Sequence, residues 1–131
     1  MEGGDGMRLN EYQEKAMTTC MDSSNNPLYM LFMLGEEIGE LQGKFSKAIR
    51  KGNIQFDNNN LECLNRKVEF IDEFEDLVKK ELGDILWGVA GLCHVKGWTL
   101  EDVAQTNLNK LAARKAIGTI DGNGDGIARG K

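Results

Sequence analysis

Apolar side chains recur every three or four positions along most of the chain, which is the spacing of one face of an α-helix. Two long stretches carry this pattern, from Leu28 to about Lys51 and from about Leu61 to Lys96. Their apolar positions are Leu31, Leu34, Ile38, Leu41, Phe45 and Ala48 in the first, and Val68, Ile71, Phe74, Val78, Leu82, Ile85, Val89 and Leu92 in the second. The spacing predicts two long helices packed along their whole length, the second with a possible break near Ile71 or Asp72.

Two shorter helices flank the long ones. The first is expected from about Asn10 to Asp22, with Asn10 as its N-cap and Gln13 completing a capping box. The last is expected to be capped by Thr99 and to end near Gly118, where a glycine can stop a helix. These caps predict four helices in all.

Polar loops separate the predicted helices, at residues 23–26 and again at residues 53–60. No segment shows a convincing alternation of period two, so we expect an all-α fold, a four-helix-type bundle. The length of 131 residues fits a single domain over residues 1–131. Glycines gather at both ends, so residues 1–8 and 118–131 are predicted to be flexible.

Composition narrows the class of protein. A net charge of −5 disfavours general binding to nucleic acid or to a membrane surface. No apolar run approaches the roughly 20 residues that span a bilayer, and the N-terminus lacks the apolar stretch of a signal peptide. Three scattered cysteines, Cys20, Cys63 and Cys93, favour reduced thiols over disulfides or a zinc cluster. We therefore expect a cytoplasmic protein.

Two carboxylate pairs lie beside the apolar stripes of the long helices. Glu37 and Glu40 are three residues apart, as are Glu81 and Asp84, and residues at this spacing share a helix face. If the two helices pack antiparallel, the pairs can face each other. Four crowded carboxylates repel, and a hard divalent cation such as Mg²⁺ relieves that repulsion. The alternative is that both pairs are ordinary solvated faces.

The motifs around these carboxylates resemble those of a known family. Residues 36–40 (EEIGE) match the EExxE motif, and residues 81–84 (ELGD) match the ExxD motif, of the MazG-like nucleotide pyrophosphohydrolases. Residues 9–13, 81–87 and 100–114 resemble further segments of the family's short bacterial and phage members. The stretch from Leu41 to Lys80 is longer than the family's usual spacing, and an insertion around Glu62 to Asp76 would account for this.

The resemblance implies an all-α NTP pyrophosphohydrolase bundle that assembles as a homodimer or homotetramer. It implies Mg²⁺-dependent hydrolysis of a nucleoside triphosphate to monophosphate and pyrophosphate, with Mn²⁺ as an alternative cation. The metal ligands carried over from the family are Glu37, Glu40, Glu81 and Asp84. Glu36 would be an auxiliary ligand or would help to activate water.

Substrate contacts are expected from several basic and aromatic residues. Asn107, Lys110 and Arg114 share a face of the last helix and could bind phosphate, although basic residues also suit a solvated helix C-terminus. Lys44 and Lys47 either contact phosphate or pair with the acids. Trp87 could stack on the base, although an aromatic residue in a helical stripe is more often part of the core.

Two other classes of function remain open. One is a non-catalytic helical bundle that binds a partner or a regulatory nucleotide. The other is a calcium module, because residues 121–126 (DGNGDG) match the first half of an EF-hand loop. The glutamate that such a loop needs at its twelfth position would be residue 132, so we do not expect calcium binding here.

Overall fold

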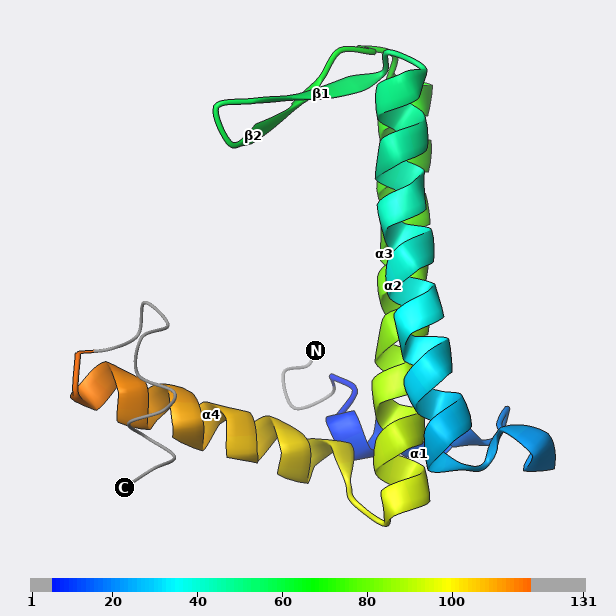
Figure 1. Cartoon of the computed structure of the whole chain (residues 1–131), viewed down its shortest axis with the longest axis vertical. Coiled ribbons are helices and arrows are strands. Elements are labelled where there is room, and N and C mark those ends of the chain that lie inside the picture. The colour runs from blue at the N-terminus through cyan, green and yellow to red at the C-terminus, as the bar shows by residue number, and fades with distance from the viewer. Residues whose placement is uncertain (1–5, 119–131) are drawn as a thin grey trace.

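The computed structural model describes residues 6–118, and it is mostly helical with a small two-stranded sheet (Figure 1). Its elements in chain order are α1 (Leu9–Met17), the short 3-10 helix η2 (Asp22–Ser24), α2 (Pro27–Arg50), β1 (Ile54–Asp57), β2 (Asn60–Cys63), α3 (Val68–Lys96) and α4 (Leu100–Ala116). The prediction of four helices is confirmed. The proposed calcium loop and nearly all of the two ends predicted to be flexible lie outside the described residues.

The antiparallel pair of α2 and α3 forms the axis of the molecule (Figure 1). The Asn26 side chain caps α2 by accepting a hydrogen bond from the Tyr29 backbone N–H at 2.7 Å, and Pro27 occupies the first helical position. Gly97 ends α3 in the left-handed conformation, with φ of 75°. The hairpin lies at one end of the pair, whereas α1 and α4 lie at the other (Figure 1).

The two long helices approach closely at two glycines of α3. A Cβ atom on Gly91 would lie 2.5 Å from Sδ of Met30, which is fully buried. A Cβ on Gly88 would lie 3.1 Å from Cδ1 of Leu34. The lack of a side chain at Gly88 and Gly91 therefore allows α2 and α3 to approach closely, one to two helical turns beyond Asp84.

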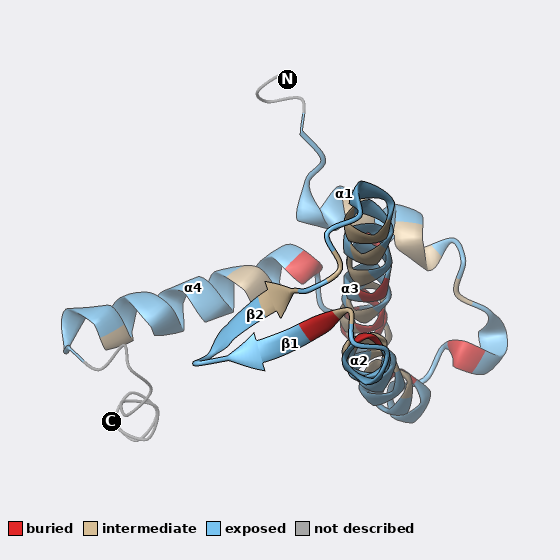
Figure 2. Ribbon diagram, turned by 90° about the horizontal axis from the view of Figure 1, so that it is seen from above, coloured by how far each residue is buried: buried red, intermediate tan, exposed pale blue. Residues whose placement is uncertain are grey.

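A small core holds α1, α3 and α4 together at the base of the pair. Ala90, Cys93 and Leu100 are buried there, with Tyr12, Met17, Val89 and Val103 packed against them. Figure 2 shows the buried residues gathered along α3 and at the start of α4, while most of α4 is exposed. Among the residues described, no helix is both long enough and apolar enough to cross a bilayer.

A buried glutamine on α1 links the ends of three helices. The Gln13 Nε2 donates to the backbone carbonyls of Trp98 (3.1 Å) and Ala90 (3.4 Å), and its Oε1 accepts from the Leu100 N–H at 2.7 Å. Asn10 supports the same junction, since its Oδ1 accepts from the Glu101 N–H at 3.0 Å. The first N–H groups of a helix have no acceptor within that helix, and these bonds supply acceptors for two of them at the start of α4.

The expectation of an all-α fold is wrong for residues 54–63, which form an antiparallel hairpin. Asn58 and Asn59 adopt positive φ angles of 51° and 69° at its tip, a conformation that asparagine tolerates and that suits a two-residue hairpin turn. The polar loop expected at residues 53–60 is therefore largely strand and turn. As a consequence α3 begins at Val68 rather than near Leu61, and it continues unbroken past Ile71.

Two further boundaries differ from expectation. The first helix ends at Met17 rather than Asp22, and its N-cap is Arg8 rather than Asn10. Asn10 caps α4 instead, as described above. The capping interaction of α1 comes from Glu11, whose Oε1 accepts from the Arg8 N–H at 3.4 Å. The α4 cap is as predicted, because Thr99 Oγ1 accepts from the Asp102 N–H at 3.1 Å.

Candidate metal centre

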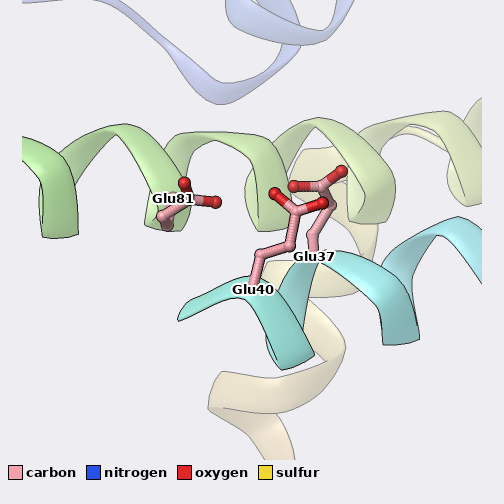
Figure 3. A group of neighbouring side chains, drawn as sticks. All are labelled: Glu37, Glu40 and Glu81. Atoms are coloured by element: carbon pink, nitrogen blue, oxygen red, sulfur yellow. The ribbon is translucent and has the colours of Figure 1, made fainter. Parts of the chain in front are cut away.

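Three carboxylates from the two long helices meet midway along the pair. Glu37 and Glu40 extend from α2 toward Glu81 of α3, and one oxygen of each lies within 4.8 Å of the others (Figure 3). The antiparallel packing brings the two motifs together because Glu37 and Glu40 share a face of α2 that turns toward α3. The arrangement supplies hard oxygen ligands, which Mg²⁺ prefers.

Two oxygens of this cluster are buried without a hydrogen-bond partner. They are Glu37 Oε1 and Glu81 Oε1, and the whole Glu81 residue is only 8% exposed. A buried charged oxygen without a partner is costly. A divalent cation between the helices would satisfy both oxygens, so the residues present fit a metal ion.

The electrostatics of the cluster favour the same interpretation. Partial burial raises the pKa of Glu37, and the negative charges of Glu40, Asp84, Glu81 and Glu36 raise it further. A basic side chain offsets this negative charge only in part, because Lys44 Nζ lies 3.8 Å from Glu81 Oε2 and Lys44 is itself partly exposed. The carboxylates of the site therefore carry more negative charge than Lys44 balances.

A small pocket of about 240 Å³ adjoins the carboxylates. Glu37 and Asp84 line it on the acidic side, and Tyr29, Met33 and Trp87 complete it. Trp87 is held in place by the end of α1 and the turn after it, because its Nε1 donates to the Ala16 carbonyl at 3.2 Å and to Thr19 Oγ1 at 2.9 Å. An aromatic surface is thus fixed beside the acidic cluster.

The MazG nucleotide pyrophosphohydrolase domain, as a family model, matches residues 25–117. The chain belongs to the MazG family. The Gene 37 protein of Mycobacterium phage L5 is 32% identical over 126 aligned residues, which cover 91% of this chain and 98% of that protein. No solved structure matches the chain. The resemblance inferred from the motifs is therefore confirmed.

The acidic residues of the two MazG motifs differ in how far they are exposed to solvent. Glu81 is buried and Glu37 is half-buried, whereas Glu36, Glu40 and Asp84 are exposed. Glu36 belongs to the charges that surround Glu37, although it is not one of the three clustered carboxylates. The centre is consequently open to solvent on one side, as a site for a soluble substrate must be.

Within one MazG chain, the residues of the last helix that were predicted to bind phosphate do not lie near the carboxylates. Asn107, Lys110 and Arg114 lie on α4, which packs on α1 and α3 at the base of the molecule and then runs away from the α2–α3 pair (Figure 1). Lys47 is exposed on α2, one turn beyond Lys44. Of the predicted phosphate-binding residues, only Lys44 contacts the cluster.

Sequence reasoning missed two residues that line the pocket. Tyr29 and Met33 stand eight and four residues before Glu37 on the same helix, so the helical repeat places them near the same face. The spacing of four residues from Tyr29 to Met33 to Glu37 is the sequence signal that places them on one face.

Proposed function

We propose that this MazG-family chain hydrolyses nucleoside triphosphates, ribo- or deoxyribo-, to the monophosphate and pyrophosphate, in nucleotide-pool housecleaning or turnover. The observation that carries the proposal is the pair of buried, unpartnered oxygens, Glu37 Oε1 and Glu81 Oε1, inside one group of carboxylates. A non-catalytic bundle has no need to hold such charges together.

The proposed ligands of the cation are Glu37, Glu40, Glu81 and Asp84, with Glu36 as an auxiliary ligand or as a group that helps to activate water. Mg²⁺ is the proposed ion, and Mn²⁺ also suits oxygen ligands. When bound, the cation supplies Lewis acidity toward the phosphates and lowers the pKa of water. The absence of histidine from the group suits this chemistry, because phosphoryl transfer depends mainly on positioning and charge neutralisation.

The chain's own residues bind and orient the triphosphate. Lys44 stands beside Glu81, where its ammonium group would contact a phosphate oxygen of the substrate, and Lys47 extends the same basic edge. Glu36 is exposed beside the centre, where its carboxylate can take a proton from the attacking water. Water then adds to phosphorus as the α–β phosphoanhydride bond breaks and pyrophosphate leaves.

The nucleoside is proposed to lie in the pocket beside the carboxylates, against Trp87. The support is its position: Trp87 lies beyond Asp84 on α3, and Tyr29 and Met33 offer further contact surface. Because Trp87 is already tied to α1, binding would not have to order its ring.

The protein is proposed to act as a homo-oligomer. α2 also carries apolar side chains that its packing on α3 leaves largely exposed: Leu28, Leu31, Ile38 and Ile49. Exposed apolar side chains gathered on one helix are typical of a surface that packs on another protein. Asn107, Lys110 and Arg114 would then bind phosphate only where α4 of one copy reaches the carboxylates of another.

The test is pyrophosphate release from a panel of standard and modified NTPs and dNTPs, with and without Mg²⁺. Magnesium-dependent release with an equal yield of monophosphate supports the proposal. The Glu81→Gln variant should lose turnover and keep its helicity, whereas Glu73→Gln, on the exposed surface of α3, should keep both. A folded, magnesium-binding protein that releases no pyrophosphate would point instead to a regulatory or binding role.

A further inference from the structure

The β1–β2 hairpin has one polar face and one apolar face. Its register pairs Ile54 with Cys63 and Phe56 with Leu61, and directly paired residues of an antiparallel ladder point to the same side. The alternate pairs are polar, and Gln55 Nε2 donates to Glu62 Oε1 across the strands at 2.7 Å. The hairpin is therefore amphipathic, although it projects from the end of the helix pair (Figure 1).

The apolar face is only partly covered within the chain. Ile54 at the root of the hairpin is buried, but Phe56 is 62% exposed and Leu61 is 46% exposed. Phe56 lines a groove with Leu41, Phe45 and Ile49 of α2. Leu61 and Cys63 line a second groove, of about 360 Å³, with Ile71, Phe74 and Val78 of α3.

Both grooves open on the side of the helix pair that faces away from the carboxylates. Gln42 lines the first groove two residues after Glu40, and Lys79 lines the second two residues before Glu81, so the helical repeat puts each on the opposite side of its helix from the carboxylate. The same spacing separates Ile38 from Glu40 and Leu82 from Asp84. Ile38 and Leu82 are 42% and 50% exposed. Figures 1 and 2 show the hairpin and α4 projecting to the same side of the pair.

The exposed apolar side chains on this side suit an interface between two copies. Ile49 beside the first groove is 42% exposed, as is Ile38, and Leu82 and Phe56 are 50% and 62% exposed. Apolar side chains gathered in this way on one face mark a surface that another protein covers. An isologous contact also suits this surface, since the same apolar helix faces would meet in both copies.

We infer that the hairpin is a clasp: its apolar face, Phe56 and Leu61 above all, closes over the α2–α3 pair of a second copy of this chain. The inference rests on the self-association proposed above, and not on the proposed hydrolysis. It gives the hairpin, an element outside the carboxylate site, the task of holding the dimer together.

The experiment compares two matched double variants by sedimentation equilibrium across a dilution series. Phe56→Ser with Leu61→Ser removes the apolar face, whereas Gln55→Ser with Glu62→Ser alters the same strands on the polar face. We expect the wild type and the polar-face variant to be dimers. The apolar-face variant should dissociate at concentrations at least tenfold higher, with unchanged far-UV circular dichroism and magnesium binding.

If the wild-type chain sediments as a monomer, both the proposed self-association and the clasp are overturned. A dimer that is equally tight in all three proteins would overturn the clasp alone. Because mass and pyrophosphate release are measured separately, failure of the proposed hydrolysis is distinguishable from either result.

A conservative variant covers the case in which the serine variant fails to fold. Phe56→Trp keeps an aromatic ring at the position, and the difference between its emission and that of the wild type, which contains Trp87 and Trp98, reports burial at position 56. We expect this difference spectrum to shift to longer wavelength as dilution separates the copies. A difference spectrum that stays constant while the mass halves would overturn the inference.

Discussion

Lys44 and Glu81 face each other across the helix pair, with Nζ of the lysine 3.8 Å from Oε2 of the glutamate. The lysine thus lies at the edge of a group of carboxylates of which one oxygen of Glu81 and one of Glu37 have no hydrogen-bond partner. It partly offsets their charge in the metal-free protein. In the proposed reaction a bound cation would offset this charge instead, and the ammonium group would then be available to a phosphate.

The Lys44→Met variant separates these two roles. We expect KM for the nucleotide to rise about tenfold, because a charge-assisted hydrogen bond to phosphate is lost. Magnesium affinity should not fall, because removing a positive charge leaves the carboxylates more attractive to a cation. Steady-state kinetics and isothermal titration with Mg²⁺ measure the two effects.

The control for this experiment is Lys51→Met, at the exposed C-terminal end of α2. It removes the same charge from the same helix, away from the carboxylates. An unchanged KM in Lys44→Met, or an equal rise in both variants, would show that Lys44 has no specific contact with the substrate.

The raised pKa of Glu37 makes a prediction about stability. Burial, and then the neighbouring carboxylates, hold this pKa above the ordinary value of 4.5. Because the folded protein holds the Glu37 proton more tightly than the unfolded chain does, the fold loses stability as the pH rises from the ordinary pKa through the raised one. Glu37→Gln removes that loss, so its melting temperature in EDTA should exceed the wild type's by a few degrees at pH 7.5 and by less at pH 5.

Magnesium should reverse the order of the two proteins. A ligand that binds only the folded state raises the melting temperature, so saturating Mg²⁺ should stabilise the wild type far more than Glu37→Gln. Glu69→Gln, at the exposed start of α3, should follow the wild type throughout. A Glu37→Gln protein that gains as much from Mg²⁺ as the wild type would remove Glu37 from the ligands.

The long helices and the meeting of their carboxylates were predictable from the sequence. The apolar repeat includes residues that the pair does bury, such as Ala48, but also Ile38 and Leu82, which are 42% and 50% exposed. A connection of modest length makes antiparallel packing the simple solution. Glu37 and Glu81 adjoin positions of this repeat, so antiparallel packing can bring them together.

The hairpin was not predicted, because each strand has only four residues and the apolar alternation spans Ile54 and Phe56, then Leu61 and Cys63. So short an alternation is weak beside the long helical repeat that follows. The direction of α4 was not predictable either. It depends on Gln13 and Leu100, which are 87 positions apart and carry no local pattern.

The glycines of α3 give a prediction about packing. Gly91→Val should lower the free energy of unfolding by about 1–3 kcal/mol, because Met30 already occupies the space that a Cβ would need. Gly43→Val is the matched control: a Cβ at that position on α2 meets nothing within 4 Å. Urea denaturation measures both. Equal stability of the two variants would mean that the close approach of the helices at Gly91 is dispensable.

Gln13 makes the most specific prediction about the base of the molecule. Gln13→Met keeps the length of the side chain but removes its donor and its acceptor. The Leu100 N–H and the Trp98 carbonyl then lose their partner near a buried junction, at a cost of about 2–4 kcal/mol in the free energy of unfolding. Since the lost bonds join α1 to the start of α4, the Leu100 amide should lose its protection from hydrogen exchange before the amides in the middle of α3 do.

The control is Gln105→Met, which breaks an exposed hydrogen bond between Gln105 Nε2 and Asn109 Oδ1 on the surface of α4. It removes the same amide from the same protein without uncovering a buried group, so its stability should stay within about 0.5 kcal/mol of the wild type. Protection of the Leu100 amide that survives in Gln13→Met would show that the apolar contacts of Ala90, Cys93 and Leu100 hold α4 in place without the glutamine.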